Sequence, residues 1–343
     1  MSSMRYTSIL VLALLGAVAT AGADPMPSTA VQGARYATDA YPGFDNEEEN
    51  VKPERKEPRW FSFINGPNRD NAADQYAYCQ ELLAAEDWSK ARKQLDALVR
   101  EWPTAPEAWK AQLQLAETCL NRLGDTEDAF CEYRYLLDFY SVQCDYAAVA
   151  DQLYKVAGQL KLEGREVMFV RFANTVDVRR FHEMCVLRAP GAKWVPEAML
   201  TIARLREDEG KFAEAIKVYE NLRNLHPDTE EAKTAIGREA ATRMIVLREH
   251  GYNRARCQDT IDFLTLAIKG CLPADAEDIR RDLAEAKALA EEASYQGAKF
   301  YDSSTRTRRS ALNAYERFLS DYPESPHADE VRGRIEELKG AAK

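Results

Sequence analysis

The sequence predicts an all-α fold, and three observations support this prediction. From residue 71 onward Ala, Leu, Glu, Lys and Arg dominate, and all of them favour helices. Apolar residues recur there at spacings of three and four, which places them on one face of a helix, and alternating β-branched residues are nearly absent. Two of the expected helices, in "QLDALVREWP" and "AIKVYENLRNLHP", run up to a proline that stops them.

The bulk composition is that of a folded chain with little affinity for nucleic acid. The chain has 343 residues, of which 45% are apolar and 30% charged, too apolar for a wholly disordered protein. Its formal net charge is −10 and its isoelectric point is near 5.2. This negative charge repels a phosphate backbone and argues against nucleic acid as a partner.

Residues 1–23 have the pattern of a secretory signal peptide. Arg5 precedes an apolar run at 9–18 that is too short to span a bilayer, and small residues at 21–23 suit cleavage before Asp24. The alternative is a buried N-terminal helix, which the glycines in this segment disfavour. We therefore expect an exported protein.

The next segment, 24–70, reads as a mostly disordered linker, because it is rich in proline, glycine and charge without a helical or strand period. An apolar island at 59–67 interrupts it, with Trp60, Phe61 and Phe63. We expect this island to dock onto the first helices of the same chain. A peptide that binds a partner is the alternative.

Residues 71–340 repeat a common spacing. A small or β-branched residue is followed after twelve positions by a break, an apolar residue stands at the seventh position, and three of the six copies have tyrosine at the fourth. These offsets lie on one helical face. The six starting residues are Ala91, Ala129, Val178, Ala215, Ile261 and Ala311, and the breaks are Pro103, Ser141, Pro190, Pro227, Pro273 and Pro323.

The repeating unit is predicted to be a helical hairpin. Gly124 and Gly210 stand five residues before two of the starts, and another amphipathic run precedes each turn, at 107–120 and 196–205. A single hairpin cannot bury its apolar face, so such units stack into a solenoid. We expect about five to six helix pairs, closed by a capping helix at 328–340.

Known catalytic and ligand-binding motifs were searched for without success. There is no glycine-rich phosphate loop and no nucleophile elbow. The stretch beginning at His182 resembles a zinc-protease helix, but Val186 stands where the second histidine is needed. The sequence therefore predicts no catalytic residue, no cofactor and no metal site, and a protein that is not an enzyme. An enzyme with its site on the helical surface is the alternative class.

The seven cysteines form no CxxC pair. Cys119 and Cys131 stand on either side of the turn at Gly124, so a hairpin would bring them near each other. Two readings are open: a disulfide, or two thiols buried in the core, as expected for Cys79 and Cys185.

A binding groove is the function that a solenoid without an active site suggests. Its first helices would build pockets for an extended or helical peptide. Counting back from the starts to the preceding helices gives the candidate groove residues Tyr76, Gln80, Gln114, Asn121, Arg204 and Glu207.

Over about residues 71–338 the repeat resembles the tetratricopeptide repeat family, although Leu113 and Met199 replace the family's early tryptophan. This resemblance implies a right-handed superhelix with first helices on its concave side. The segments 213–232 and 314–331 look like repeats of BamD, the outer-membrane β-barrel assembly lipoprotein. The resemblance to BamD implies a periplasmic scaffold that contacts the barrel insertase or unfolded outer-membrane proteins.

The chain departs from the BamD pattern at the lipid anchor. The family needs a cysteine directly after the small residues, where Asp24 stands, and the first cysteine is Cys79. We therefore expect association with the outer membrane through partners rather than through a transmembrane helix. The alternative is an unlipidated periplasmic adaptor that resembles the cell-envelope coordinator CpoB.

Overall fold

The computed structural model describes residues 41–44, 54–58, 66–166, 175–249, 253–303 and 307–340, without the side chains of 161–166 and 175–177. Residues 1–23, with the expected signal peptide, and Trp60, Phe61 and Phe63 lie outside the described residues. In the described part all regular structure is helical. The helices are α2 (Ala72–Ala84), α3 (Trp88–Glu101), α4 (Ala108–Thr118), the π-helical turn η3 (Cys119–Leu123), α5 (Thr126–Phe139), α6 (Tyr146–Glu166), α7 (Thr175–Arg188), α8 (Val195–Asp208), α9 (Phe212–Leu225), α10 (Glu230–Glu249), α11 (Arg254–Gly270), α12 (Ala276–Asp302), α13 (Arg308–Asp321) and α14 (Ala328–Gly340).

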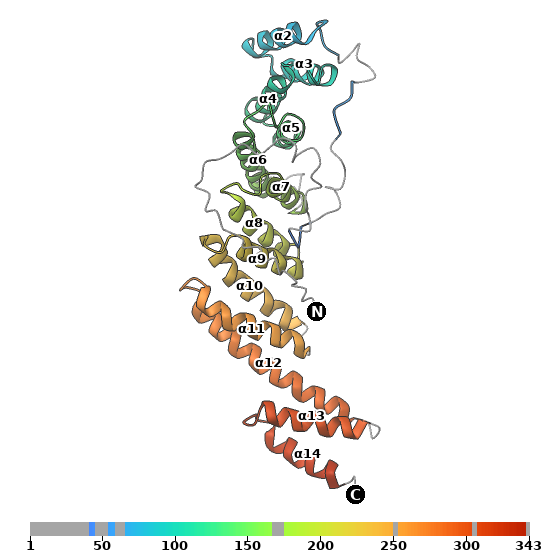
Figure 1. Cartoon of the computed structure of the whole chain (residues 1–343), viewed down its shortest axis with the longest axis vertical. Helices are drawn as coiled ribbons and strands as arrows, with labels where there is room; N and C mark the ends of the chain where they lie inside the picture. The colour runs from blue at the N-terminus through green and yellow to red at the C-terminus, as the bar shows by residue number, and fades with distance from the viewer. Residues whose placement is uncertain are drawn as a thin grey trace, which may run out of the picture.

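The helices pair as six hairpins that follow one another along the long axis of the molecule. The pairs are α2–α3, α4–α5, α6–α7, α8–α9, α10–α11 and α12–α13, and α14 closes the far end (Figure 1). The main contacts within the described residues join a helix to the next helix or the next but one, such as α8 to α10. This is a helical repeat solenoid, and the predicted all-α fold is confirmed.

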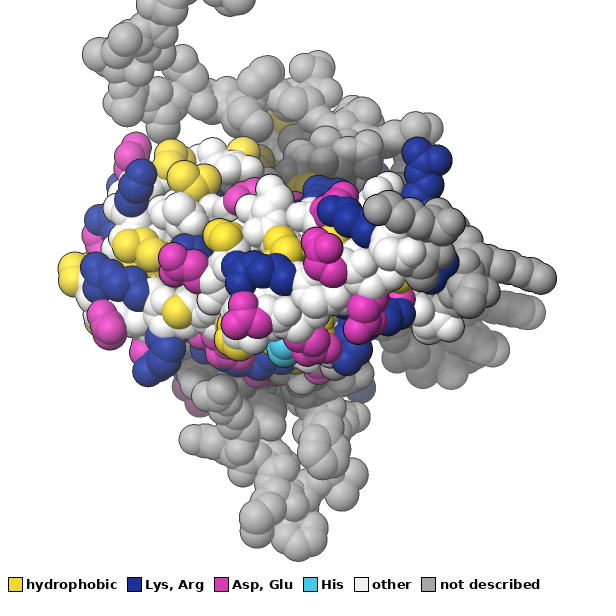
Figure 2. All heavy atoms as spheres, turned by 90° about the horizontal axis from the view of Figure 1, so that it is seen from below, with side chains coloured by type: hydrophobic (Ala, Val, Ile, Leu, Met, Phe, Trp, Pro, Cys, Tyr) yellow, Lys and Arg dark blue, Asp and Glu magenta, His cyan; other side chains and the backbone are white. Residues whose placement is uncertain are grey.

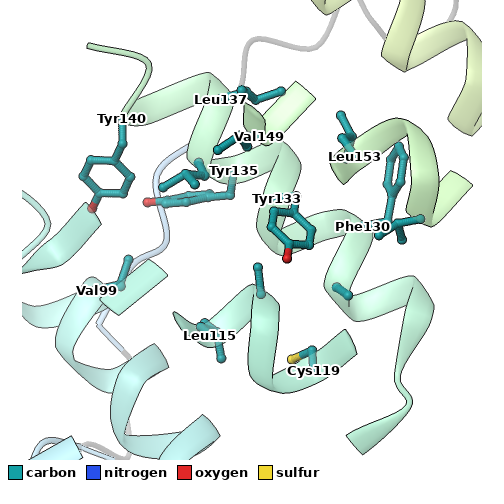
Figure 3. Close-up of a cluster of buried hydrophobic side chains, with 14 of the residues drawn as sticks. Val99, Leu115, Cys119, Phe130, Tyr133, Tyr135, Leu137, Tyr140, Val149 and Leu153 are labelled. Carbon is teal, nitrogen blue, oxygen red and sulfur yellow. The ribbon is translucent and has the colours of Figure 1, made fainter. Parts of the chain in front are cut away.

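The buried side chains form four clusters in chain order. The first joins α2 to α7, the second α7 to α10, the third α10 to α12 and the fourth α12 to α14. In the first cluster, Phe130 and Tyr133 of α5 pack with Leu115 of α4 and Leu153 of α6 (Figure 3). Each hairpin therefore completes its core with its neighbours.

A shared spacing sets the length of the second helices. Five of the six predicted starting residues, all except Ile261, are buried. In each of these five copies the helix ends ten residues later, and the next backbone N–H bonds to the carbonyl at the seventh position. The Trp102 N to Leu98 O distance is 2.9 Å, and the Tyr140 N to Leu136 O and Tyr322 N to Phe318 O distances are both 2.8 Å. The predicted interval therefore fixes the distance from a buried starting residue to the end of the helix.

The register predicted for the fifth copy is wrong by one residue. In α11 the buried positions at this spacing are Thr260, Leu264 and Ala267, whereas Ile261 is half-buried and Thr265 is exposed. The helix ends at Gly270, and its last bond runs from Cys271 N to Ala267 O at 2.9 Å. The proline here follows its helix one residue later than in the other copies, so counting back from it shifted the face.

Glycines make two of the hairpin turns, as predicted. Gly124 and Gly210 have φ values of 67° and 72°, in the left-handed region that costs other residues free energy. At the second turn, Gly210 N bonds to Glu207 O at 2.9 Å and Lys211 N to Arg206 O at 2.9 Å, which satisfies the last carbonyls of α8.

The last helix closes the stack with a charged surface. Val331, Ile335 and Leu338 of α14 face the fourth cluster. The face seen from this end of the molecule mixes basic and acidic side chains with scattered apolar ones (Figure 2). This arrangement agrees with the predicted capping role, because a polar outer face keeps the end of a solenoid in water.

Of the two readings left open for Cys119 and Cys131, the disulfide is not formed in the structure. Cys119 is buried in the first cluster, whereas Cys131 is exposed on α5, and both are free thiols. The reason lies in the geometry of α5, whose buried face carries Ala129, Phe130 and Tyr133 and so turns position 131 toward solvent. The alternative of a buried core thiol holds for Cys119 but not for Cys131.

Three short pieces ahead of the helices pack on the solenoid, and we call them the N-terminal arm: 66–69, 54–58 and 41–44. Pieces 66–69, 54–58 and 41–44 contact α2 and α3, α3 and α5, and α8 and α9 respectively, so the earlier a piece stands in the sequence, the further along the stack it is bound (Figure 1). The described parts of the predicted linker are therefore bound to the repeat units.

Candidate protein-binding surfaces

Two of the predicted groove residues link the first helices of neighbouring hairpins. Gln80 of α2 donates to Gln114 Oε1 of α4 at 2.6 Å, and Gln114 Nε2 donates back to Gln80 Oε1 at 3.2 Å. Both side chains are partly exposed. This pair of bonds holds α2 and α4 side by side and leaves each amide with one further N–H donor.

The other predicted groove residues are spread along the stack. Glu207 of α8 accepts hydrogen bonds from Arg238 and Thr242 of α10, so it also joins two first helices. Tyr76 packs on the first cluster, and its pKa is raised by burial and then by neighbouring acidic groups. Arg204 and Asn121 are exposed.

The six groove residues therefore belong to three hairpins rather than to one pocket. Arg204 and Asn121 are the two whose side chains stand most open to a partner.

A more completely built site lies on the second helices, where the arm crosses α3 and α5. We call it the arm site; it consists of Asp96, Arg100, Glu132, Tyr135 and Phe139. The Lys56 ammonium lies 3.0 Å from Asp96 Oδ1 and also pairs with Glu132 Oε2. The side chains of Lys56 and Asp96 are each 14% exposed, so the ion pair is largely removed from water.

The arm residue before Lys56 rests on aromatic rings. The Arg55 guanidinium lies 5.0 Å from the centre of the Phe139 ring and 5.9 Å from that of Tyr140. Lys56 also lies over Tyr135, at 5.1 Å. A cation over an aromatic face is attracted by the ring quadrupole, so this part of the site favours basic side chains.

Backbone contacts fix the arm in an extended path across the arm site. Lys56 N donates to Tyr135 Oη at 3.2 Å, and Arg100 Nη1 donates to Glu57 O at 3.0 Å. Arg100 Nε also donates to Asp96 Oδ2 at 2.7 Å. Burial would raise the pKa of Asp96, but Lys56 and Arg100 outweigh it and hold this pKa below its ordinary value.

The arm site is not visible in the sequence. The run "KPERKEPR" at 52–59 lies in the segment predicted to be a linker, because it has no helical or strand period. Asp96 and Glu132 stand on different helices, and no spacing in the sequence connects them to residue 56. Only the stacking of α3 beside α5 brings the two carboxylates together.

The second contact of the arm lies on α8 and α9. Tyr41 and Phe44 are buried in the second cluster and stack on each other at 5.1 Å. Between them Gly43 has a φ of 94°, and its carbonyl accepts a hydrogen bond from Arg206 Nη2 at 2.7 Å. A side chain at position 43 would meet the Val218 side chain, so the approach requires glycine.

Arg206 belongs to a buried network of charges between α7 and α8. Arg179 Nη1 lies 2.6 Å from Glu183 Oε1, and Arg179 Nε lies 2.8 Å from Glu209 Oε1. Arg206 Nη2 lies 3.3 Å from Glu183 Oε1. Two arginines and two glutamates balance one another, as buried charges require, so the network is structural.

The described residues contain no group of three or more His, Cys, Asp or Glu side chains that could hold a metal ion. His182 is buried, and its Nδ1 lies 2.9 Å from Val178 O within α7. Among the same residues, no helix is both long and apolar enough to cross a membrane.

Comparisons with known proteins identify the repeat. Residues 80–141 and 197–229 match models of the tetratricopeptide repeat. The first match runs from within α2 to just beyond the end of α5. The second runs from within α8 to the turn after α9, so both fall on hairpins of the stack. These matches support a tetratricopeptide-repeat protein. No curated protein matches the sequence.

Solved structures of low similarity include three from tetratricopeptide-repeat or related proteins. A tetratricopeptide repeat protein from Parabacteroides merdae has 10% identity and a TM-score of 0.28, and the match covers 78% of this chain and 98% of that one. PilW, a type IV pilus biogenesis factor, has 14% identity and a TM-score of 0.29, with 76% and 97% covered. The TPR2AB domain of yeast Sti1, in complex with an Hsp90 peptide, has 15% identity and a TM-score of 0.25, with 66% and 86% covered.

Proposed function

We propose that this chain is an exported scaffold that binds other proteins in the bacterial periplasm and takes part in outer-membrane β-barrel assembly, as BamD does. The observation that carries the proposal is the stack of tetratricopeptide-type hairpins, a fold that supports protein–protein interaction. The first helices then offer a row of polar side chains to a partner. The barrel insertase and unfolded outer-membrane proteins are the proposed partners.

The resemblance of 213–232 and 314–331 to BamD repeats supports the specific assignment. Both segments lie in hairpins of the stack: the first covers α9 and the start of α10, and the second covers most of α13 and the start of α14. In both, the tyrosine at the fourth position of the repeat spacing, Tyr219 or Tyr315, is buried. The proposed location is the periplasm, peripheral to the outer membrane.

Site-specific photo-crosslinking in cells tests this function. A photoreactive residue is placed at Arg204, which is exposed on the first helix α8, and as a matched control at Glu220, which is exposed on the second helix α9. We expect Arg204 to cross-link to the barrel insertase or to outer-membrane proteins, and Glu220 to give much less product. Absence of these partners from both positions would refute the assignment.

A second candidate is an adaptor of the CpoB kind, which the presence of Asp24 at the position of the lipid-bearing cysteine favours. The same experiment separates the two. Cross-links from Arg204 to proteins of cell-wall synthesis or division, without the insertase, would favour the adaptor. Recovery of the protein with membranes before, but not after, detergent treatment would support attachment in either case.

A further inference from the structure

The arm site has the chemistry of a peptide-recognition site. Two carboxylates, Asp96 and Glu132, converge on one lysine ammonium. Next to them Phe139 and Tyr140 receive an arginine. Together they recognise an adjacent Arg-Lys pair, while the bonds to Lys56 N and Glu57 O select an extended backbone.

The contact of the arm is short and open to solvent. Of the residues 54–58, only Lys56 is half-buried, and the other four are exposed. A tethered segment of this kind is bound at a local concentration on the order of millimolar, so a partner peptide in trans can compete with it. The arm therefore has the properties of an internal ligand.

A cavity beside the arm site leaves room for a longer ligand. It has a volume of about 250 Å³ and lies between α3 and α5. Its wall combines the acidic Asp96, Asp128 and Glu132 with the basic Arg92, Lys93 and Arg100, and no residue of the arm lines it. A peptide that places a further side chain here would make contacts that the arm does not make.

We propose that the α3–α5 surface binds extended peptides of partner proteins that contain adjacent Arg and Lys, and that Arg55 and Lys56 occupy it as a displaceable internal ligand. The site lies on second helices, so the proposal does not depend on β-barrel assembly or on the surface around Arg204. Release of the arm would expose the two carboxylates to a basic partner.

Fluorescence anisotropy with a labelled peptide of residues 52–59 tests the proposal. The full chain is compared with the R55S/K56S variant, whose arm cannot fill the site. We expect the variant to bind the peptide roughly tenfold more tightly than the unaltered chain, because the internal competitor is gone. A peptide with serine at both basic positions should show at least a tenfold loss on the same variant.

Site variants on the R55S/K56S background locate the binding. D96N/E132Q should weaken binding of the peptide at least tenfold. E127Q is the matched control, because Glu127 is an exposed carboxylate of α5 that belongs neither to the arm site nor to the wall of the cavity. It should leave the affinity unchanged.

Two results would overturn the proposal: equal affinity of the unaltered and R55S/K56S chains, or undiminished binding by D96N/E132Q. Circular dichroism checks that each variant is folded. If D96N/E132Q does not fold, a photoreactive peptide is cross-linked to R55S/K56S and mapped by mass spectrometry. Cross-links on α3 or α5 support the site, and cross-links confined to other helices refute it.

Discussion

Lys56 shows how one side chain of the arm changes the environment of two helices. Its ammonium pairs with both Asp96 and Glu132, which approach each other from α3 and α5 beside Arg100 and Gln112. A partly buried carboxylate that loses its counter-charge is costly. The arm therefore contributes to the stability of the first two hairpins as well as covering them.

Replacing Lys56 tests this contribution. Lys56→Met should lower the free energy of unfolding by about 1.5–3 kcal/mol at neutral pH, the usual range for a lost hydrogen bond to a charged group. Lys93→Met is the control, because Lys93 is exposed on α3 and should change stability by less than about 0.5 kcal/mol. Urea denaturation measures both, and equal effects would contradict the role of Lys56.

The difference in unfolding free energy between wild type and Lys56→Met should decrease at low pH. The pKa of Asp96 is lowered in the folded protein, against the tendency of its burial to raise it, because Lys56 and Arg100 favour the carboxylate. Its contribution is therefore complete above the ordinary aspartate pKa of about 3.9 and is lost as pH falls through the lowered value. The gap between wild type and Lys56→Met should be constant from about pH 7 to about pH 5 and shrink only below about pH 4.

Thiol labelling tests the correction at the cysteines. Burial raises the pKa of Cys79 and of Cys119 to about 12, so both thiols are protonated and enclosed near neutral pH. We expect Cys131, which is exposed, to react with a thiol reagent well before Cys119 in the native protein. Peptide mapping after timed labelling measures this order, and Cys131→Ser should remove the early label. A mass change on reduction of the unlabelled protein would show that a disulfide is present after all.

At the scale of the element, α11 shows the limit of counting from a break residue. The helix is 17 residues long, whereas the other five second helices have 14, and its proline follows one residue later. Burial of Thr260, Leu264 and Ala267 depends on α10 and α12, which the spacing does not contain. The prediction was correct where proline position and packing agree and failed where they differ.

Two leucines of α11 measure its register. Leu264 is fully buried and Leu266 is 68% exposed, although both are leucines of the same helix. Leu264→Ala should cost about 2–5 kcal/mol by leaving a cavity, and Leu266→Ala less than about 0.5 kcal/mol. Thermal or urea denaturation measures the loss of stability in each variant. Similar losses for the two variants, or a larger one for Leu266, would show that the helix is rotated from the position described.

The hairpin turns give a second test at this scale. Gly210 has a φ of 72°, so Gly210→Ala should destabilise the protein by about 1 kcal/mol. Gly333 lies within α14 with open space where a Cβ would point, so Gly333→Ala should instead stabilise by roughly 0.5–1 kcal/mol. We expect the two variants to shift the calorimetric melting temperature in opposite directions. Stabilisation by Gly210→Ala would mean that this turn does not need the left-handed conformation.

At the scale of the whole molecule, the stack was predictable and the arm was not. The positions of Ala91, Ala129, Ala215 and Ala311 carry the repeat, because close packing of neighbouring helices leaves space for little more than a methyl group. The sequence therefore predicted the hairpins and their order. The positions of 41–44 and 54–58 depend on contacts with residues 40 to 175 positions away, from Lys56 with Asp96 to Gly43 with Val218, and local patterns carry no record of them.

The candidate sites also depend on contacts between residues that are far apart in the sequence. The groove residues remain a prediction, and the bonds of Gln80 to Gln114 and of Glu207 to α10 could not be foreseen, because they join residues of different repeats. The arm site was missed entirely for the same reason. Patterns within a helix predict its buried face, whereas recognition surfaces on a solenoid are made between hairpins.

Small-angle X-ray scattering of the purified protein tests the stacked arrangement most directly. A compact globule of this length would have a radius of gyration of about 20 Å and a symmetric distribution of interatomic distances. An elongated stack should have a clearly larger radius of gyration and a skewed distance distribution with a long tail. Its scattering curve should also show the region typical of a rod. A radius near that of the globule, with a bell-shaped distribution, would contradict it.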